Sequence, residues 1–358
     1  MSEEQRSGIG VFEKYLTLWV LLCMGAGVLI GKFVSAIPDF LESLEVAGIN
    51  MPIAILIWLM IYPMMMKVDF KSVMNVRKHP KAVLISTGST WVIKPFLMFG
   101  LATLFLALIF KPLIPADLAQ DFVTGAVILG VAPCTAMVFV WSALTKGDPA
   151  YTLVQVSIND IIILILFIPL VQLLLGINNV AVPWDTLAFS VVLFVVVPLA
   201  AGAATRILMI RKKGIEYFNR KFVPKFGGIT SVGLLLTLIL IFSFQGDVIM
   251  EQPLFVLLIA VPLILQNIIS WSLTYGLCIW TRQPHRVAAP VSLIAASDFF
   301  ELAVAVAIAL FGPGSPVVLV CTVGVLTEVP VMLLLVKIVN KTKNRFPQDN
   351  RGDTIIRT

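Results

Sequence analysis

The sequence predicts an all-α polytopic membrane protein with ten transmembrane helices. Of its 358 residues, 59% are hydrophobic and only 13% are charged, whereas soluble domains carry about 25% charged residues. Apolar stretches of roughly twenty residues, the length that crosses a bilayer as a helix, recur along the whole chain. Transmembrane β-strands are shorter and alternate in polarity, so helices are the expected form.

The ten expected helices are apolar and are separated by polar segments. They span residues 14–34, 51–66, 82–110, 122–145, 150–175, 186–210, 227–245, 253–281, 287–311 and 316–339. The second helix ends in three methionines, Met64–Met66, which we expect to face lipid or a neighbouring helix. The polar residues 340–358 are expected to form a disordered cytoplasmic tail.

Lysine and arginine predict the orientation. With the amino terminus in the cytoplasm, 23 of the 26 basic residues lie in cytoplasmic segments, two lie outside (Lys32 and Lys111), and Lys94 lies within a span. By the positive-inside rule, both termini are expected in the cytoplasm and the chain in the plasma membrane. The formal charge of +6 is explained by these loops, so no nucleic-acid partner is expected. His79 and His285 fall in the same loops and are expected to be solvated.

Cysteine and glycine patterns exclude several classes of protein. The four cysteines, Cys23, Cys134, Cys278 and Cys321, all lie in apolar segments, which favours free thiols over disulfides. No CxxC, CxxH or HExxH spacing predicts a metal site. No P-loop or Rossmann glycine pattern predicts nucleotide binding, so neither a cofactor nor ATP-driven pumping by this chain is expected.

The two halves of the chain carry similar motifs, which predict an internal repeat. Cys134 and Glu301 each lie 15 residues before a proline, and Asp160 and Glu328 lie 11 and 12 residues after it. Five helices per half would give the second half the opposite topology, as in many secondary transporters. We therefore expect repeats at residues 1–175 and 176–339.

Ionisable side chains deep in membrane helices are costly, so each is a candidate functional residue. They are Lys94, Asp160, Asp298, Glu301 and Glu328. Burial disfavours a charged carboxylate, which makes Glu301 a candidate proton carrier; the alternative is a static hydrogen bond. Asp298 is a further candidate for proton coupling. Asp160 and Glu328 are expected to carry protons or to accept hydrogen bonds from freed backbone N–H groups. We expect Lys94 to pair with one of the carboxylates.

Two breaks are expected near the membrane midplane. Pro133 should interrupt the fourth helix and the Ser297–Asp298 pair the ninth, so that half-helix ends point partial charges at a substrate. The alternatives are an ordinary kink at Pro133 and a continuous helix on which Asp298 and Glu301 share a face.

Cys134 lies directly at the first expected break. Its thiol is a soft ligand, which suggests a thiophilic solute held by one thiol and released again. Thr135 and Asn159 are expected to support the broken region. The remaining cysteines are expected to be packing residues.

Three motifs carry a family resemblance. The runs APCTAMVFVWS at 132–142, DPAYTLVQVSIND at 148–160 and FFELAVA at 299–305 closely resemble the arsenite efflux permeases of the arsenical-resistance family, which is related to the sodium–bile acid symporters. The resemblance covers nearly the whole chain. It implies a ten-helix carrier with a panel domain (helices 1, 2, 6 and 7) and a core domain (helices 3–5 and 8–10), in which broken helices 4 and 9 cross.

The resemblance also implies a function and two site residues. Family members expel trivalent arsenite, and some expel antimonite, in exchange for protons. Their essential cysteine matches Cys134 and their essential glutamate matches Glu301. The chain departs from the family at Asp298, where members commonly have Asn, and the extra carboxylate puts the proton count in question.

The expected activity is secondary active export of arsenite by alternating access. The rival interpretation is a sodium-coupled symporter of an organic anion on the same scaffold, with side-chain amides as sodium ligands, namely those of Gln155, Asn159, Gln266 and Asn267. A receptor is less supported because no extramembrane signalling domain is evident. An enzyme is less supported because no intramembrane histidine could activate Cys134.

Overall fold

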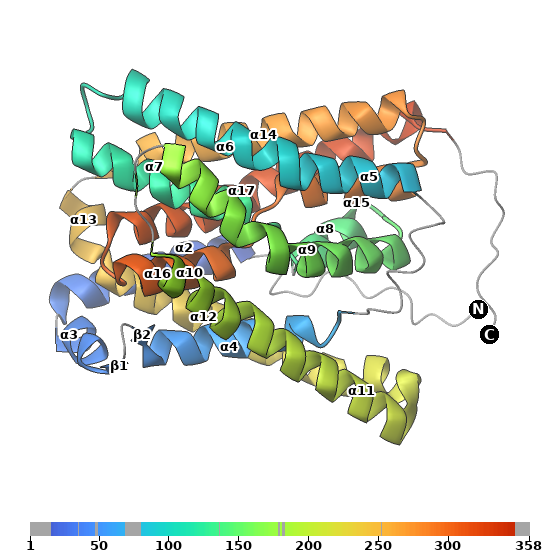
Figure 1. Cartoon of the computed structure of the whole chain (residues 1–358), viewed down its shortest axis with the longest axis horizontal. Coiled ribbons are helices and arrows are strands. Elements are labelled where there is room, and N and C mark those ends of the chain that lie inside the picture. The colour runs from blue at the N-terminus through green and yellow to red at the C-terminus, as the bar shows by residue number, and fades with distance from the viewer. Residues whose placement is uncertain are drawn as a thin grey trace.

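In the computed structural model, the described residues are 16–34, 36–46, 49–68, 80–135, 137–177, 180, 183–251 and 253–347, and they form a bundle of helices (Figure 1). The named elements are, in chain order, α2 (Leu16–Phe33), α3 (Ala36–Ser43), β1 (Glu45–Val46), β2 (Ile49–Asn50), α4 (Met51–Met65), α5 (Pro80–Gly88), α6 (Lys94–Ala102), α7 (Ala116–Val131), α8 (Met137–Leu144), α9 (Pro149–Ile177), α10 (Trp184–Val191), α11 (Val197–Tyr217), α12 (Gly227–Phe244), α13 (Gly246–Glu251), α14 (Pro253–Trp280), α15 (His285–Ala296), α16 (Phe300–Phe311) and α17 (Pro316–Lys341). The strands β1 and β2 form one short antiparallel pair.

Short π-helical and 3-10 turns join several of these helices. The π-helical turn Ser89–Ile93 joins α5 to α6, and Thr103–Ile109 extends α6, so that the three segments form one continuous helical stretch with α5. The π-helical turn Val192–Val196 joins α10 to α11. A further π turn, Phe218–Phe222, and a 3-10 turn, Val223–Phe226, lead into α12. Helices occupy each of the ten stretches that the hydropathy pattern predicts.

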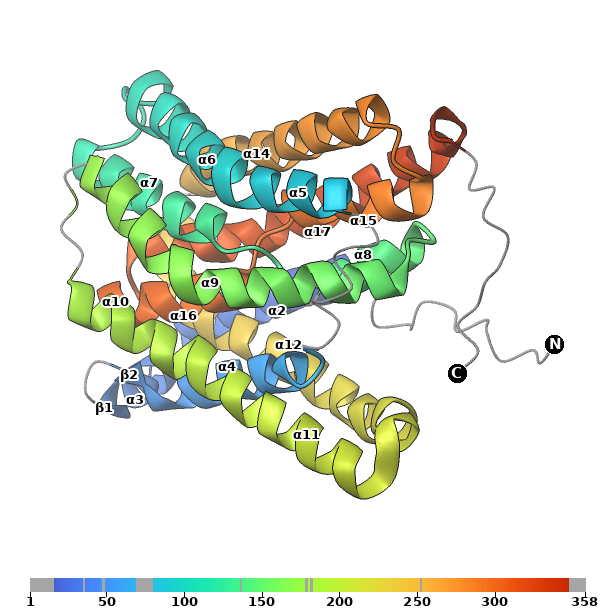
Figure 2. The ribbon, with the colours of Figure 1, turned by 45° about the vertical axis from the view of Figure 1, so that its right-hand side comes forward.

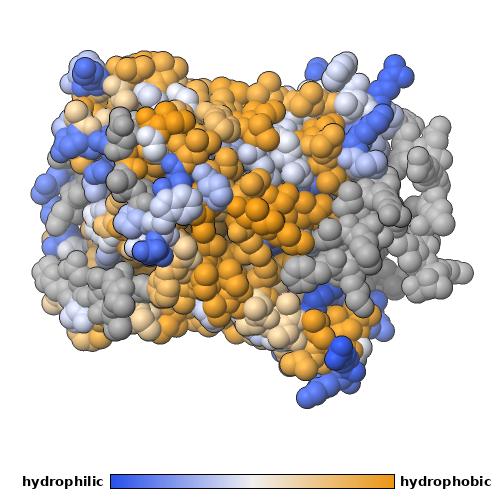
Figure 3. Space-filling model, viewed as in Figure 1, coloured by the Kyte–Doolittle hydropathy of each residue, from blue (hydrophilic) through white to orange (hydrophobic). Residues whose placement is uncertain are grey.

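The described helices have the length and composition of membrane spans. Among the described residues, five helical stretches are long and apolar enough to cross a bilayer: Pro80–Ile109, Pro149–Ile177, Trp184–Phe244, Pro253–Trp280 and Pro316–Lys341. Figure 3 shows a hydrophobic band across the middle of the surface, with hydrophilic residues toward both ends. The chain is therefore an all-α membrane protein, while the ten crossings and the inverted repeat stay predictions.

One group of helices packs around α12. α12 lies against α2 and α4, and α4 also contacts α11. Figure 2 shows α4, α11 and α12 on the lower side of the molecule. The backbones of α2 and α12 approach closely at Gly27, where an added Cβ atom would lie 2.5 Å from the carbonyl oxygen of Ile239. Glycine permits this contact because it has no side chain.

A second group packs around α7, α14 and α17. α7 lies between α6 and α17, while α14 contacts α6, α15 and α17. At Gly125 of α7 an added Cβ atom would lie 2.5 Å from the carbonyl oxygen of Val317, so α7 and α17 also pack at short range. α16 bridges the two groups through α4 and α10. The division into panel and core domains stays a prediction.

Two expectations from the sequence, that His285 is solvated and that the polar residues after 339 are disordered, are wrong for the described residues. His285 is buried rather than solvated, with its ring 5.6 Å from that of Phe346. Phe346 is itself buried and lies 5.0 Å from the ring of Tyr275. Because these aromatic contacts anchor the chain, residues 340–347 are ordered instead of forming a disordered tail. His79 and residues 348–358 lie outside the described residues.

Candidate functional site

Two helices are interrupted inside the second group. α7 ends at Val131 and α8 begins at Met137, while α15 ends at Ala296 and α16 begins at Phe300. The residues that follow the first half-helices, Ala132 and Ser297, are extended, with φ/ψ of −88°/114° and −83°/148°. At Ala132 the cause is Pro133, which disfavours a helical conformation in the preceding residue. The first interruption is therefore a break rather than a kink.

The two breaks pair with each other through their backbones. Pro133 lies opposite Asp298 in an isolated antiparallel β-bridge. The N–H of Phe299 donates to the carbonyl oxygen of Ala132 over 2.9 Å, and the N–H of Cys134 donates to that of Ser297 over 3.4 Å. These bonds satisfy backbone groups that the helices leave free, which apolar surroundings require. Asp298 thus lies in the break, so it shares no helical face with Glu301.

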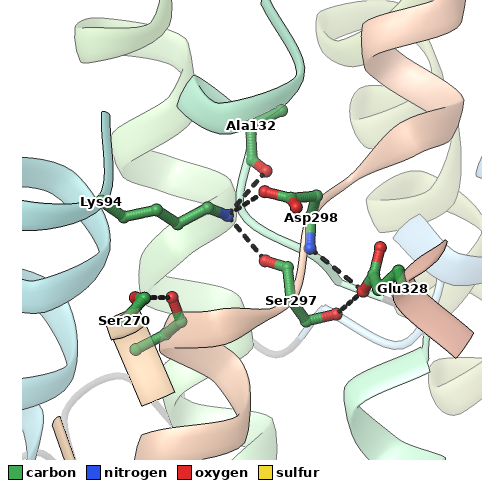
Figure 4. Close-up of polar contacts among 7 residues, drawn as sticks. Lys94, Ala132, Ser270, Ser297, Asp298 and Glu328 are labelled. Atoms are coloured by element: carbon green, nitrogen blue, oxygen red, sulfur yellow. Dashed lines mark hydrogen bonds and ion pairs between the residues drawn. The ribbon is translucent and has the colours of Figure 1, made fainter. Parts of the chain in front are cut away.

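Lys94 binds this crossing from one side (Figure 4). Its ammonium lies 2.6 Å from Oδ1 of Asp298 and donates to the carbonyl oxygens of Ser297 and Ala132 over 2.7 and 3.3 Å. The Lys94 side chain is completely buried. The expected pairing of Lys94 with an intramembrane carboxylate is confirmed, and its partner is Asp298. Beside it, the Ser270 hydroxyl donates to the carbonyl oxygen of Ala295.

Glu328 of α17 holds the same crossing from another side. The Ser297 hydroxyl donates to Oε1 of Glu328, and the backbone N–H of Asp298 donates to the same oxygen over 3.1 Å. Glu328 therefore accepts a hydrogen bond from a backbone group freed by the break, one of the two roles expected for it. Two carboxylates and one ammonium are thus concentrated at a single crossing.

Asp160 of α9 has a different environment. It is 1% exposed, and neither carboxylate oxygen has a hydrogen-bond partner among the described residues. By contrast, the neighbouring Asn159 accepts hydrogen bonds at Oδ1 from Trp91 and Gln155 over 3.2 and 3.3 Å. Gln155 also donates to the Thr87 hydroxyl. Asn159 thus ties α9 to the α5–α6 stretch, while Asp160 contributes no such bond.

A cavity of about 230 Å³ lies between α4, α12, α8 and α16, and Glu301 is part of its wall. Glu301 stands in the first turn of α16 and is 4% exposed. The cavity is lined by Met60, Pro63, Met64, Lys67, Met137, Val140, Val223, Pro224, Phe226, Gly227, Thr230, Leu234, Phe300 and Glu301. A smaller cavity of about 20 Å³ beside Asp298 and Glu328 shares three of these residues, Met137, Leu234 and Phe300.

Cys134 and Thr135 are buried in the first break and are not among the residues that line the larger cavity. Met65 and Met66 are buried beside Gly202 of α11, which agrees with the expected contact with a neighbouring helix. Met64 lines this cavity, a role that was not predicted from the sequence. Met60 and Met64 are four positions apart and so share a helical face. This four-residue spacing is the sequence feature that could have predicted their shared role in the cavity wall. Thioethers are soft ligands, like thiols.

Broken helices that cross inside a membrane bundle, with freed backbone groups and buried charges at the crossing, are typical of secondary transporters. The sequence comparisons agree with this class. The model of the Sodium Bile acid symporter family matches residues 54–252. The arsenical-resistance protein Acr3 of Alkaliphilus metalliredigens is 56% identical over 341 residues, which cover 95% of this chain and 96% of the relative.

Two further relatives match almost the whole chain. An uncharacterised transporter of Synechocystis is 42% identical, covering 97% of this chain and 93% of the relative. The Acr3 protein of Corynebacterium glutamicum is 35% identical, covering 92% and 88%. The chain therefore belongs to the sodium bile acid symporter family, within the arsenical-resistance permeases.

Proposed function

We propose that this chain exports trivalent arsenite from the cytoplasm in exchange for protons, by alternating access. Two relatives named as arsenical-resistance proteins match nearly the whole chain and support the substrate. The observation that carries the exchange is the position of Glu301, a buried carboxylate in the wall of the cavity of about 230 Å³ between α4, α8, α12 and α16.

Glu301 is the proposed proton carrier. A carboxylate in the first turn of a helix is favoured by the helix dipole when charged, whereas burial favours its neutral form. These opposed effects suit a carboxyl group that is charged while the cavity is open to one side of the membrane. The same group would be neutral while the carrier changes its opening from one side to the other. We propose that protonation of Glu301 and occupancy by arsenite exclude each other.

Asp298 is not needed as a second carrier. Its carboxylate is paired with the ammonium of Lys94 at 2.6 Å, and Glu328 is occupied as a hydrogen-bond acceptor of the break. Asp160, which has no hydrogen-bond partner among the described residues, is the remaining candidate for a second proton. The carboxylate of Asp298, where the resemblance implies Asn, is therefore paired with the Lys94 ammonium and is not proposed as an extra moving charge.

Proton exchange gives the export its driving force. Arsenite at neutral pH is mainly the uncharged hydroxide As(OH)3, so the membrane potential acts on the cycle only through another charge. One inward proton gains about 2.3 kcal/mol per 100 mV. That free energy supports an arsenite gradient of roughly fifty-fold.

The cavity supplies soft contacts for the substrate. Met60, Met64 and Met137 are part of its lining together with Glu301. Cys134 lies deeper, at the crossing itself, where its thiol either contacts arsenic during the cycle or shapes the site. Lys67 is also part of the lining, and the positive-inside rule assigns it to the cytoplasmic side. We therefore propose that this cavity opens to the cytoplasm.

The test is arsenite uptake into inverted membrane vesicles with an acidic lumen and no sodium. The native chain is expected to accumulate arsenite, and Glu301→Gln is expected to reduce accumulation to background. Glu251→Gln is the matched control, because Glu251 is exposed on α13. Normal uptake by Glu301→Gln would rule out the proposed carrier. Uptake that requires sodium would favour the symporter interpretation instead.

Cys134→Ser separates the two roles of the thiol. If Cys134 binds arsenic, the variant loses both uptake and arsenite binding, measured by calorimetry on the purified chain. If the thiol only shapes the site, binding is retained and uptake falls by a smaller factor.

A further inference from the structure

The ammonium of Lys94 occupies a position with the chemistry of a cation site. Its three neighbours are all oxygens: the carbonyls of Ala132 and Ser297 and the carboxylate of Asp298, at 3.3, 2.7 and 2.6 Å. An ammonium has three N–H donors and no acceptor. All three donors are used and the side chain is fully buried. The Lys94 ammonium therefore fills this position itself and leaves no room for a free cation.

The surroundings of this site are negative. Ala132 and Ser297 directly follow the last residues of α7 and α15. A helix carboxyl end carries about half a negative charge. The two helix carboxyl ends and the Asp298 carboxylate concentrate negative charge at one buried position, and a cation placed between them stabilises it. In secondary transporters, unwound carbonyls and half-helix carboxyl ends of this kind coordinate the coupling cation.

Local structure places Lys94 against this site. A π-helical turn, Ser89–Ile93, comes directly before it, and such turns are frequent at functional sites. Pro95 follows directly, so Lys94 lies between a π-helical turn and a proline within one helical stretch. α6 packs closely on the last turn of α7: an added Cβ atom at Gly130 would lie 2.6 Å from the Met98 side chain. The lysine is therefore built into the crossing rather than reaching it by chance from a distant loop.

We propose that Lys94 is a tethered cation that permanently fills a monovalent-cation site at the helix crossing, and that the site binds an alkali cation once the ammonium is removed. The inference is independent of the exported solute, because it concerns only the oxygens around Nζ. It follows that the native chain needs no free Na⁺ or K⁺ at this position. A truncated Lys94 leaves the Asp298 carboxylate and both carbonyls without their partner, which a small cation can replace.

The experiment is the thermal unfolding of the purified full-length chain in NaCl, KCl or choline chloride at one ionic strength. The native chain is expected to unfold at the same temperature in all three salts. Lys94→Ala is expected to unfold at a lower temperature in choline and to regain stability saturably in NaCl or KCl. The gain should be about 5 °C when the cation is in roughly hundred-fold excess over its Kd.

The double variant Lys94→Ala/Asp298→Asn is the matched control. It lacks both the ammonium and the carboxylate, so its unfolding temperature should not depend on the cation. A Lys94→Ala chain equally unstable in alkali and choline salts would overturn the proposal, as would a native chain stabilised by Na⁺ or K⁺.

Lys94→Gln provides a second route if Lys94→Ala does not fold in choline. The proposal requires that an alkali cation restores folded protein to at least one of the two variants. If neither folds in NaCl or KCl, the site does not accept a free cation and the proposal fails.

Discussion

The backbone N–H of Asp298 donates to the carboxylate of Glu328 over 3.1 Å. Through this bond α17 supports the break between α15 and α16, and the hydroxyl of Ser297 donates to the same oxygen. A buried donor that loses its acceptor costs about 1–3 kcal/mol. Glu328 is therefore a part of the scaffold at the crossing.

Glu328→Ala and Glu328→Gln should behave differently. We expect Glu328→Ala to lower the free energy of unfolding by about 2 kcal/mol, because two donors lose their acceptor. Glu328→Gln keeps a carbonyl oxygen that can accept both bonds, so it should remain near native stability and retain arsenite uptake. Thermal unfolding and vesicle uptake measure the two effects. Loss of uptake in a stable Glu328→Gln chain would show that Glu328 carries protons.

Asp160→Asn is expected to leave the fold intact. Neither oxygen of Asp160 has a hydrogen-bond partner among the described residues, and an amide is less costly than a carboxylate to bury. The unfolding temperature should be unchanged or higher, while proton-driven arsenite uptake falls if Asp160 carries a second proton. The adjacent Asn159→Ala is the contrast, because it breaks two buried bonds and should destabilise the chain by about 1–3 kcal/mol. A destabilised Asp160→Asn chain would contradict this assignment.

Gly125 and Gly324 should differ in their tolerance of alanine. At Gly125 the new methyl group would meet the carbonyl oxygen of Val317 at 2.5 Å, a backbone atom that moves only with α17. At Gly324 it would meet the Leu129 side chain, which can rotate away. We expect Gly125→Ala to destabilise the chain by about 1–3 kcal/mol and Gly324→Ala by less. Thermal unfolding of both variants in one detergent checks the order, and the reverse order would be inconsistent with this packing.

Met64→Trp should block transport without unfolding the chain. Met64 is part of the wall of the 230 Å³ cavity that contains Glu301, and an indole ring would occupy much of that space. Leu59→Trp is the control, since Leu59 is 43% exposed on the same helix and lies outside this cavity. We expect arsenite uptake at background for Met64→Trp and near native for Leu59→Trp. Equal uptake by the two variants would mean that this cavity is not on the transport path.

The hydropathy pattern predicted the helices well. Every stretch expected to be a membrane helix is helical, and Pro133 marks a break at the expected place. These features are local: a run of apolar residues or a proline acts on its own segment regardless of the rest of the chain. The buried ionisable residues were also identified from sequence, because a charge inside an apolar run is unusual wherever it occurs. The burial of His285 and the order of residues 340–347 were not predicted. Both depend on ring contacts of Phe346 with Tyr275 and His285, which are about 60–70 positions away in the sequence.

The sequence by itself determined an apolar helical chain, the places where its helices break and the short set of charged residues within them. Only the tertiary structure decided that Lys94 pairs with Asp298, that Glu328 serves the break as an acceptor and that Asp160 has no hydrogen-bond partner among the described residues. The hydrogen bond from Lys94 to Ser297 joins residues 203 positions apart. Several apolar helices each carry one buried charge. The packing of the helices decides which of these charges lies at a break, and no local sequence pattern predicts that packing.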